Sequence, residues 1–264
     1  VYQALLQHFP ESSLRGDALY AMGTSFEALK KWSDATNAYS EFLKSFPKDP
    51  NFLTVRLRKA EALKQQRQLN EAASIFADLA KAPGFPEADI AAMGEAECLF
   101  LLERFADAAK RYQLIAQRFP KSKYKPEANL AAGKAFYRIR QFPTAVPALQ
   151  SLIKVGGELQ WEAAHWLCRI SLAQKQPNQV IELLGKLPAA PAGHEFLVAL
   201  RLDHADALFD SGKLDQAMAN YAEIADRYSR DSHAAQARYN AAVTALQLKR
   251  STDAKMHATR FLAD

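Results

Sequence analysis

Residues 32–39 read WSDATNAY, in which Trp32 precedes Ala35 by three positions and Ala35 precedes Tyr39 by four. This block of an aromatic residue or leucine, then alanine, then an aromatic residue returns along the chain. Its other copies begin at Leu69, Phe105 and Leu214, with weaker copies at Phe142 and around Val180. Residues four apart lie on one face of an α-helix. The block therefore predicts a helix that is repeated in tandem.

The final residue of the block recurs with a nearly constant period of 35 to 37 residues. It stands at Tyr2, Tyr39, Phe76, Tyr112, Leu149, Leu184, Tyr221 and Ala258. A small residue precedes each block alanine by twelve positions, at Gly23, Ala60, Ala96, Gly133, Cys168, Ala205 and Ala242. Two antiparallel helices approach closely only where neither carries a bulky side chain. Each period therefore predicts a pair of closely packed helices.

Proline and glycine mark the expected helix ends. Second helices are predicted to close at Phe9-Pro10, Phe46-Pro47, Phe119-Pro120, Tyr228-Ser229, Gly156-Gly157 and the stretch 188–193. We therefore expect one leading helix and seven helix pairs, near 1–10, 15–47, 51–82, 86–120, 126–155, 158–187, 193–229 and 231–264. They form one array over residues 1–264. No capping repeat with a polar outer face is evident, so we expect a fragment of a longer protein.

The pair near 158–187 departs most from the repeat, because Cys168 and Val180 occupy its small positions. One interpretation is looser or differently angled packing at this pair. The other is ordinary drift in a degenerate repeat.

The order of small residue, alanine, aromatic residue and proline resembles the tetratricopeptide repeat (TPR), and Gly23, Ala35, Tyr39 and Pro47 carry it in the first full pair. The resemblance implies an all-α fold, an α-solenoid with a right-handed superhelix. It also implies a scaffold that binds a peptide or partner domain on its concave face. The period exceeds the usual TPR length of about 34. This length, with the run Tyr2–Ser12, resembles bacterial cell-envelope TPR proteins, and implies a periplasmic location and a role in envelope assembly.

Two other functions fit the same pattern. The second hypothesis is a non-catalytic targeting or regulatory arm of a larger enzyme. It is also consistent with self-association into a homo-oligomer, since the open ends of a solenoid expose apolar helix faces.

The composition excludes several classes of protein. The chain has 264 residues, 49% hydrophobic and 24% charged, which is typical of a folded protein. No apolar run approaches the ~20 residues that span a bilayer. The histidines are scattered, and neither a metal-binding spacing nor a glycine-rich phosphate loop is present. We therefore predict no catalytic residue, cofactor, metal site or small-molecule substrate. Cys98 and Cys168 lie two repeats apart and should remain unpaired thiols.

Candidate partner-binding residues follow from the TPR resemblance, because the first helix of each pair lines the concave face of such proteins. The repeat phase then selects Tyr20, Thr24, Glu61, Lys64, Glu97, Lys134, Tyr137, Arg138, His165, Arg169, Asp206 and Tyr239. Their charges are banded: acidic at Glu61 and Glu97, basic from Lys134 to Arg169, and acidic again at Asp206. Because guanidinium groups pair with carboxylates, the basic band favours an acidic peptide. The alternative is that these side chains are simply solvated.

The positive charge of the chain is concentrated in residues 104–140, which carry ten basic and two acidic side chains. Such a segment suits an acidic protein, an anionic membrane surface or nucleic acid, and is equally consistent with a solvated loop. Nucleic acid is the least favoured partner, because its binding proteins repeat basic and stacking residues along a groove and this cluster is local.

Overall fold

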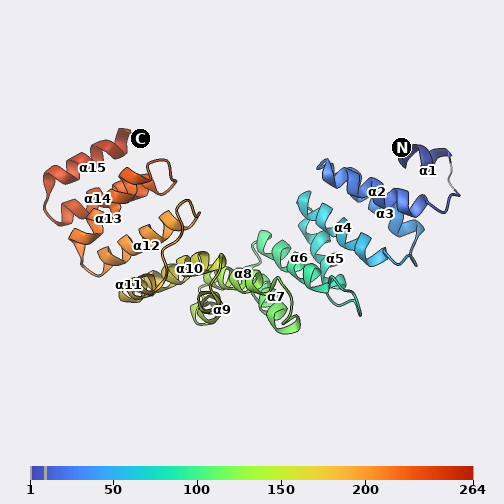
Figure 1. The fold of residues 1–264 in the computed structure, drawn as a ribbon, viewed down its shortest axis with the longest axis horizontal. Helices are drawn as coiled ribbons and strands as arrows, with labels where there is room; N and C mark the ends of the chain where they lie inside the picture. The colour runs from blue at the N-terminus through green and yellow to red at the C-terminus, as the bar shows by residue number, and fades with distance from the viewer. Residues whose placement is uncertain (1, 9–10, 264) are drawn as a thin grey trace. The chain divides into compact units, whose positions relative to one another are not determined.

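The computed structural model describes residues 2–8 and 11–263, and this part of the chain forms fifteen α-helices and no strand (Figure 1). The helices are α1 (Tyr2–His8), α2 (Arg15–Ala28), α3 (Trp32–Ser45), α4 (Phe52–Gln65), α5 (Leu69–Leu79), α6 (Ala88–Leu101), α7 (Phe105–Arg118), α8 (Lys125–Arg138), α9 (Phe142–Val155), α10 (Leu159–Ala173), α11 (Pro177–Lys186), α12 (Leu197–Asp210), α13 (Leu214–Arg227), α14 (Ala234–Gln247) and α15 (Ser251–Ala263).

The contacts divide the chain into two compact units, Val1–Arg140 and Gln141–Asp264. Within each unit, every helix packs against the next one in the chain. This packing in chain order confirms the predicted all-α class and solenoid arrangement. The predicted ends of second helices are also confirmed: α3 ends before Phe46-Pro47, α7 before Phe119-Pro120 and α13 before Tyr228. The predicted stop at Phe9-Pro10 lies outside the described residues.

The small and aromatic positions of the repeat interlock in the core. In the first full pair, Ala35 and Tyr39 of α3 have no exposed surface, and Gly23 of α2 is buried against them. A Cβ atom at Gly23 would overlap Cε1 of the Tyr39 ring and stand 2.7 Å from Cδ1. At this position the close approach of the two helices therefore requires glycine.

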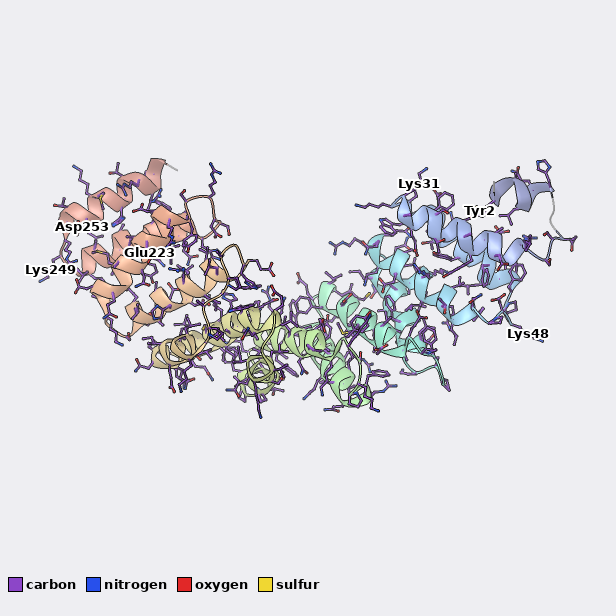
Figure 2. The ribbon with its side chains drawn as sticks, in the orientation of Figure 1. Tyr2, Lys31, Lys48, Glu223, Lys249 and Asp253 are labelled. Carbon is purple, nitrogen blue, oxygen red and sulfur yellow. The ribbon has the colours of Figure 1, made fainter. Side chains whose placement is uncertain are left out.

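The turn inside each helix pair has a repeated backbone conformation. One residue there has a positive φ: Lys30, Arg67, Glu103, Arg140, Lys175, Gly212 and Lys249. After α2 the N–H of Lys31 donates to the carbonyl of Phe26 at 2.8 Å, and the N–H of Lys30 donates to Glu27 at 2.8 Å. This is the Schellman pattern, which satisfies carbonyls at a helix end. Lys31 and Lys249 locate two of these turns in Figure 2.

The pair that departs most in sequence also departs in structure. Helix α11 has 10 residues, whereas α13, the corresponding helix of the next pair, has 14. In addition, α10 packs against α12 as well as against α11. An extended segment begins after α11, with ψ of 136° at Leu187. Because α11 is short, the extended segment that begins at Leu187 takes the place of a further helical turn beside α12.

Both cysteines are free and buried, as predicted. Burial raises the pKa of the Cys98 thiol to about 12, so the thiol is protonated at neutral pH. Among the described helices, none combines the length and apolar character needed to cross a membrane.

Candidate partner-binding face

The sequence-predicted binding residues all lie on even-numbered helices. Tyr20 and Thr24 lie on α2, Glu61 and Lys64 on α4, Glu97 on α6, and Lys134, Tyr137 and Arg138 on α8 of the first unit; His165 and Arg169 lie on α10, Asp206 on α12 and Tyr239 on α14 of the second. We call this set, unit by unit, the even-helix face. Most of these side chains are half-buried, whereas Arg138 and Tyr239 are exposed. Their role in binding stays a prediction.

In the first unit, Lys64 connects α4 to α6. Its Nζ atom lies 2.8 Å from a carboxylate oxygen of Glu61 and 2.8 Å from one of Glu97. Burial by itself would lower the pKa of the Lys64 ammonium, but the two carboxylates outweigh burial and raise the pKa. Lys64 is therefore a charged bridge between successive repeats, with its position fixed by two acceptors.

An ion pair that was not predicted, between Arg58 of α4 and Glu27 of α2, links these two helices. Nη1 of Arg58 donates to Oε2 of Glu27 at 2.9 Å. Tyr20 packs near Tyr39, with ring centroids 6.5 Å apart. The hydroxyl of Thr24 donates to the carbonyl of Ala21 in its own helix at 3.0 Å. Arg58 lies two positions before Ala60, the small residue of its repeat. The repeat phase did not select this position as exposed.

On α8 the guanidinium of Arg138 lies over the ring of Phe105, 5.9 Å from its centroid. A cation above an aromatic face is attracted by the ring quadrupole. A contact with the ring π-system does not satisfy the N–H donors of the guanidinium, which can still form hydrogen bonds. Arg138 is therefore both oriented and exposed.

In the second unit, the buried carboxylate of Asp203 connects α12 to α10. Asp203 is 1% exposed, and its Oδ2 atom lies 2.6 Å from Nδ1 of His165. Its Oδ1 atom lies 3.9 Å from Nη1 of Arg169. Asp203 was missed because it lies outside the phase read as exposed. A carboxylate within an otherwise apolar helical stripe is the signal that would have found it, since buried charges are paired.

Asp206 extends this network to α13 and α14. Its Oδ1 atom accepts a hydrogen bond from the Tyr221 hydroxyl at 2.7 Å and from Nδ2 of Asn240 at 3.4 Å. Burial raises the pKa of Asp206, and the hydrogen bond from Tyr221 opposes that rise. Oδ2 of Asp206 lies 3.9 Å from Nη1 of Arg169. Four helices therefore contribute to one polar cluster.

These contacts revise the predicted basic band. Two carboxylates that the sequence did not place beside Arg169 offset its charge, so the band is not a continuous stretch of unopposed cations. Both distances to Arg169 exceed hydrogen-bond length, so its N–H groups can still donate to a partner. Lys134 and Arg138 belong to the first unit and Arg169 to the second.

The basic segment 104–140 is partly compensated in the same way. Arg104 lies 2.7 Å from Asp107, and Arg111 lies 2.9 Å from the buried Glu95. Nη2 of Arg118 donates to the carbonyl of Ala80 at 3.1 Å, at the end of α5. Within the part of the chain that the structure describes, no group of three His, Cys, Asp or Glu side chains is arranged to hold a metal ion.

Comparisons with known proteins agree with this architecture. Models of the tetratricopeptide repeat match residues 17–49, 57–123 and 202–254, which together make up more than half of the chain. A tetratricopeptide repeat protein from Parabacteroides merdae has a similar crystal structure, with a TM-score of 0.62, 14% identity, and 94% of this chain and 92% of that chain covered. The C-terminal part of a TPR repeat-containing protein from Cytophaga hutchinsonii gives a TM-score of 0.70 at 14% identity, with 92% and 94% covered. Such low identities show the fold alone. No curated protein sequence matched the chain.

Proposed function

Because the chain belongs to the tetratricopeptide repeat family, we propose that it is a protein-binding scaffold whose even-helix face receives a peptide or partner domain. One observation carries the proposal: buried or half-buried polar side chains link successive even-numbered helices within each unit. Lys64 does this between α4 and α6, and Asp203 with His165 does it between α10 and α12. Sites for an extended partner need such polar groups at regular steps.

Prior ordering of these side chains favours binding. A long side chain that becomes ordered on association costs roughly 0.5–1.5 kcal/mol of conformational entropy. Lys64, His165 and Arg138 already have their positions restricted by neighbours in the same unit. A partner that contacts them therefore avoids part of this cost.

The partner that we propose is an acidic polypeptide, for which the first unit offers Arg138 and the second unit Arg169. Arg138 is exposed, and the side chain of Arg169 is 42% exposed. A guanidinium hydrogen-bonded to a carboxylate contributes roughly 1.5–3 kcal/mol. Each unit therefore offers one guanidinium to an acidic group of a partner.

Arg138→Gln and Arg169→Gln are each expected to weaken binding of the partner by about tenfold or more, since about 1.4 kcal/mol corresponds to tenfold. Glutamine removes the charge without adding a carboxylate beside Asp203 and Asp206. A pull-down with the immobilised chain identifies the partner, and titration calorimetry with the purified partner then gives the affinity.

Each variant has a control in its own unit. Lys44→Gln on α3 and Lys154→Gln on α9 remove exposed charges from odd-numbered helices. These controls are expected to bind the partner like the unchanged chain. Equal affinities for the arginine and lysine variants would refute the even-helix face as the docking surface.

Self-association is a second candidate function, because α14 and α15 expose several large apolar side chains. These are Tyr239, Leu246, Met256, Phe261 and Leu262, of which Leu262 is 83% exposed. Burial of such a group against a second copy would remove apolar surface from water.

Light scattering at two protein concentrations tests self-association. The average mass is expected to rise with concentration for the unchanged chain, and to stay constant for the double variant Leu246→Glu, Leu262→Glu. A constant monomer mass for the unchanged chain would rule this candidate out.

The cell-envelope setting is a further part of the proposal, and its support is the long period together with the run Tyr2–Ser12. A signal peptide and lipid-attachment cysteine upstream in the full coding sequence would favour it. A catalytic domain in the same polypeptide would instead favour the role of an enzyme's targeting arm.

A further inference from the structure

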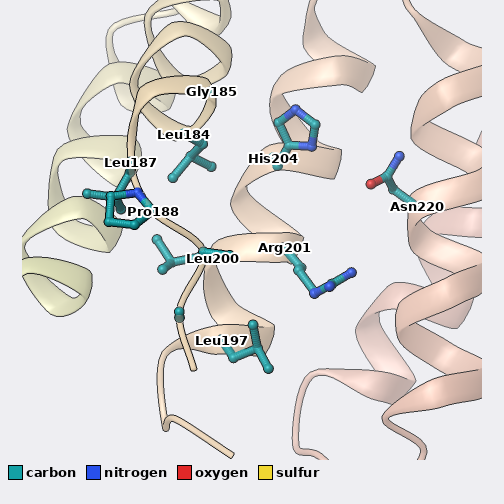
Figure 3. Close-up of a pocket in the computed structure, with 11 residues that line it drawn as sticks. Leu184, Gly185, Leu187, Pro188, Leu197, Leu200, Arg201, His204 and Asn220 are labelled. Atoms are coloured by element: carbon teal, nitrogen blue, oxygen red, sulfur yellow. The ribbon is translucent and has the colours of Figure 1, made fainter. Parts of the chain in front are cut away.

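The second unit contains a pocket of about 320 Å³ between α11, α12 and α13 (Figure 3). The segment that follows α11 forms part of its wall through Leu187 and Pro188, and α12 contributes Leu197 and Leu200. The volume is at the lower end of the range for small-ligand sites. The pocket is therefore large enough for one cyclic group rather than for an extended chain.

The pocket wall is held in place by contacts with α10. Nε1 of Trp161 donates to the carbonyl of Pro188 at 3.1 Å. The Trp161 ring also packs against His194, with centroids 4.7 Å apart, and Nε2 of His194 lies 3.0 Å from Oε1 of Glu158. The segment between α11 and α12 is therefore fixed at both ends by α10 and its N-terminal flank. The cavity that it borders is built into the structure.

The lining has an apolar side and a polar side. Figure 3 shows Leu184, Leu187 and Pro188 on one side and His204 and Asn220 on the other, with Arg201 toward the polar side. A ligand that fills the pocket therefore needs an apolar body and one hydrogen-bonding end.

The polar side favours a neutral ligand. Nη1 of Arg201 donates to Glu223 at 3.0 Å, which offsets the guanidinium charge. Burial lowers the pKa of His204, so its imidazole is neutral at pH 7; a hydrogen bond with the Asn220 side chain uses one ring nitrogen and leaves the other for a ligand. No carboxylate is among the described lining residues that could attract a cation. The Arg201 guanidinium also lies over the Tyr228 ring, 5.6 Å from its centroid.

We propose that this pocket binds the side chain of a tyrosine presented by a partner polypeptide, with the ring against the leucines and the hydroxyl toward His204 and Asn220. Tyrosine and tryptophan are the side chains with a ring and a neutral polar end. The phenol hydroxyl both donates and accepts, whereas the indole N–H only donates. Asn220 Nδ2 donates to the carbonyl of Gln216 at 2.8 Å and has a second N–H, which a phenol oxygen can accept and an indole cannot, so tyrosine is favoured.

The first unit offers a matched control, because a groove lies between α5, α6 and α7 as this pocket lies between α11, α12 and α13. It is lined by charged groups, including Glu95, Arg104 and Lys110. These charges would be desolvated by an apolar ring, so this groove is not expected to take the ligand. The tyrosine pocket involves no residue of the even-helix face, and the proposal stands independently of that face.

The indole N–H resonance of Trp161 reports on the pocket, because this group bonds to Pro188 in the wall. N-acetyltyrosinamide is expected to shift this resonance saturably, with a millimolar dissociation constant. N-acetylphenylalaninamide lacks only the hydroxyl and is expected to bind about fivefold more weakly. The Trp32 resonance, in the first unit, is expected to stay in place.

Two leucine substitutions complete the test. Asn220→Leu is expected to abolish the preference for tyrosine over phenylalanine, whereas Asn70→Leu in the α5–α7 groove is expected to preserve it. If thermal melting shows that Asn220→Leu does not fold, His204→Leu replaces it and is also expected to abolish the preference for tyrosine over phenylalanine.

Three results would overturn the proposal. No shift of the Trp161 resonance would exclude the pocket as a site for the ring. Equal affinity for the two amides would exclude the role of the hydroxyl. Binding of free p-cresol without binding of N-acetyltyrosinamide would identify a free phenol as the ligand and exclude a tyrosine within a polypeptide.

Discussion

Gly23→Ala is expected to lower the free energy of unfolding of the first unit by about 3 kcal/mol. The same substitution inside a helix usually raises stability by roughly 0.5–1 kcal/mol. The sign reverses because the new methyl group would overlap the Tyr39 ring, and that ring is fully buried beside Ala35. Repeat proteins open in parts, so hydrogen exchange of the α2 and α3 amides is the direct measurement.

Gly185→Ala is the matched control for this prediction. A Cβ atom at Gly185 of α11 would meet nothing within 4 Å, so the usual gain of roughly 0.5–1 kcal/mol is expected. A smaller side chain at position 39 should also reduce the cost, so Gly23→Ala should cost less in a Tyr39→Leu background. If Gly23→Ala stabilises the chain as Gly185→Ala does, the interlock of glycine and tyrosine is not what sets the helix spacing.

Asp203→Ala is expected to lower the free energy of unfolding of the second unit by about 2 kcal/mol. Asp203 is 1% exposed and supplies the acceptor for His165 at 2.6 Å. Its removal leaves the His165 imidazole without this partner and takes away a carboxylate that faces Arg169. The loss is expected to appear as faster hydrogen exchange in both α10 and α12, because the carboxylate connects these helices.

Two variants of the same helix sharpen this test. Asp210→Ala removes an exposed carboxylate from α12 and is expected to change stability by less than about 0.5 kcal/mol. Asp203→Asn keeps an accepting oxygen and should lose only part of what Asp203→Ala loses. Equal effects of Asp203→Ala and Asp210→Ala would contradict a linking role for the buried carboxylate.

The sequence predicted the helix pairs and their ends because these depend on local spacing. The intervals from Gly23 to Ala35 and Tyr39 lie within one pair, and Pro47 ends it. The positive φ residue in each turn was missed, since only Gly212 among these positions is a glycine. Its regular recurrence with the repeat would have been the signal.

The contacts among the candidate face residues were not predicted. Lys64 and Glu97 are 33 residues apart, and His165 and Asp203 are 38 apart. Such contacts depend on how one pair stacks on the next. A pattern within one repeat does not fix how a helix is rotated relative to the next pair. It therefore cannot predict which charged side chains of successive pairs form contacts.

The sequence by itself determined the tandem helix pairs and their period, because small and aromatic residues at fixed spacing act within one pair. Only the tertiary structure decided that carboxylates offset Arg169 and that the short α11 leaves a pocket beside α12. Both depend on packing between successive pairs, where side chains distant in the sequence compete for the same space and the same charge.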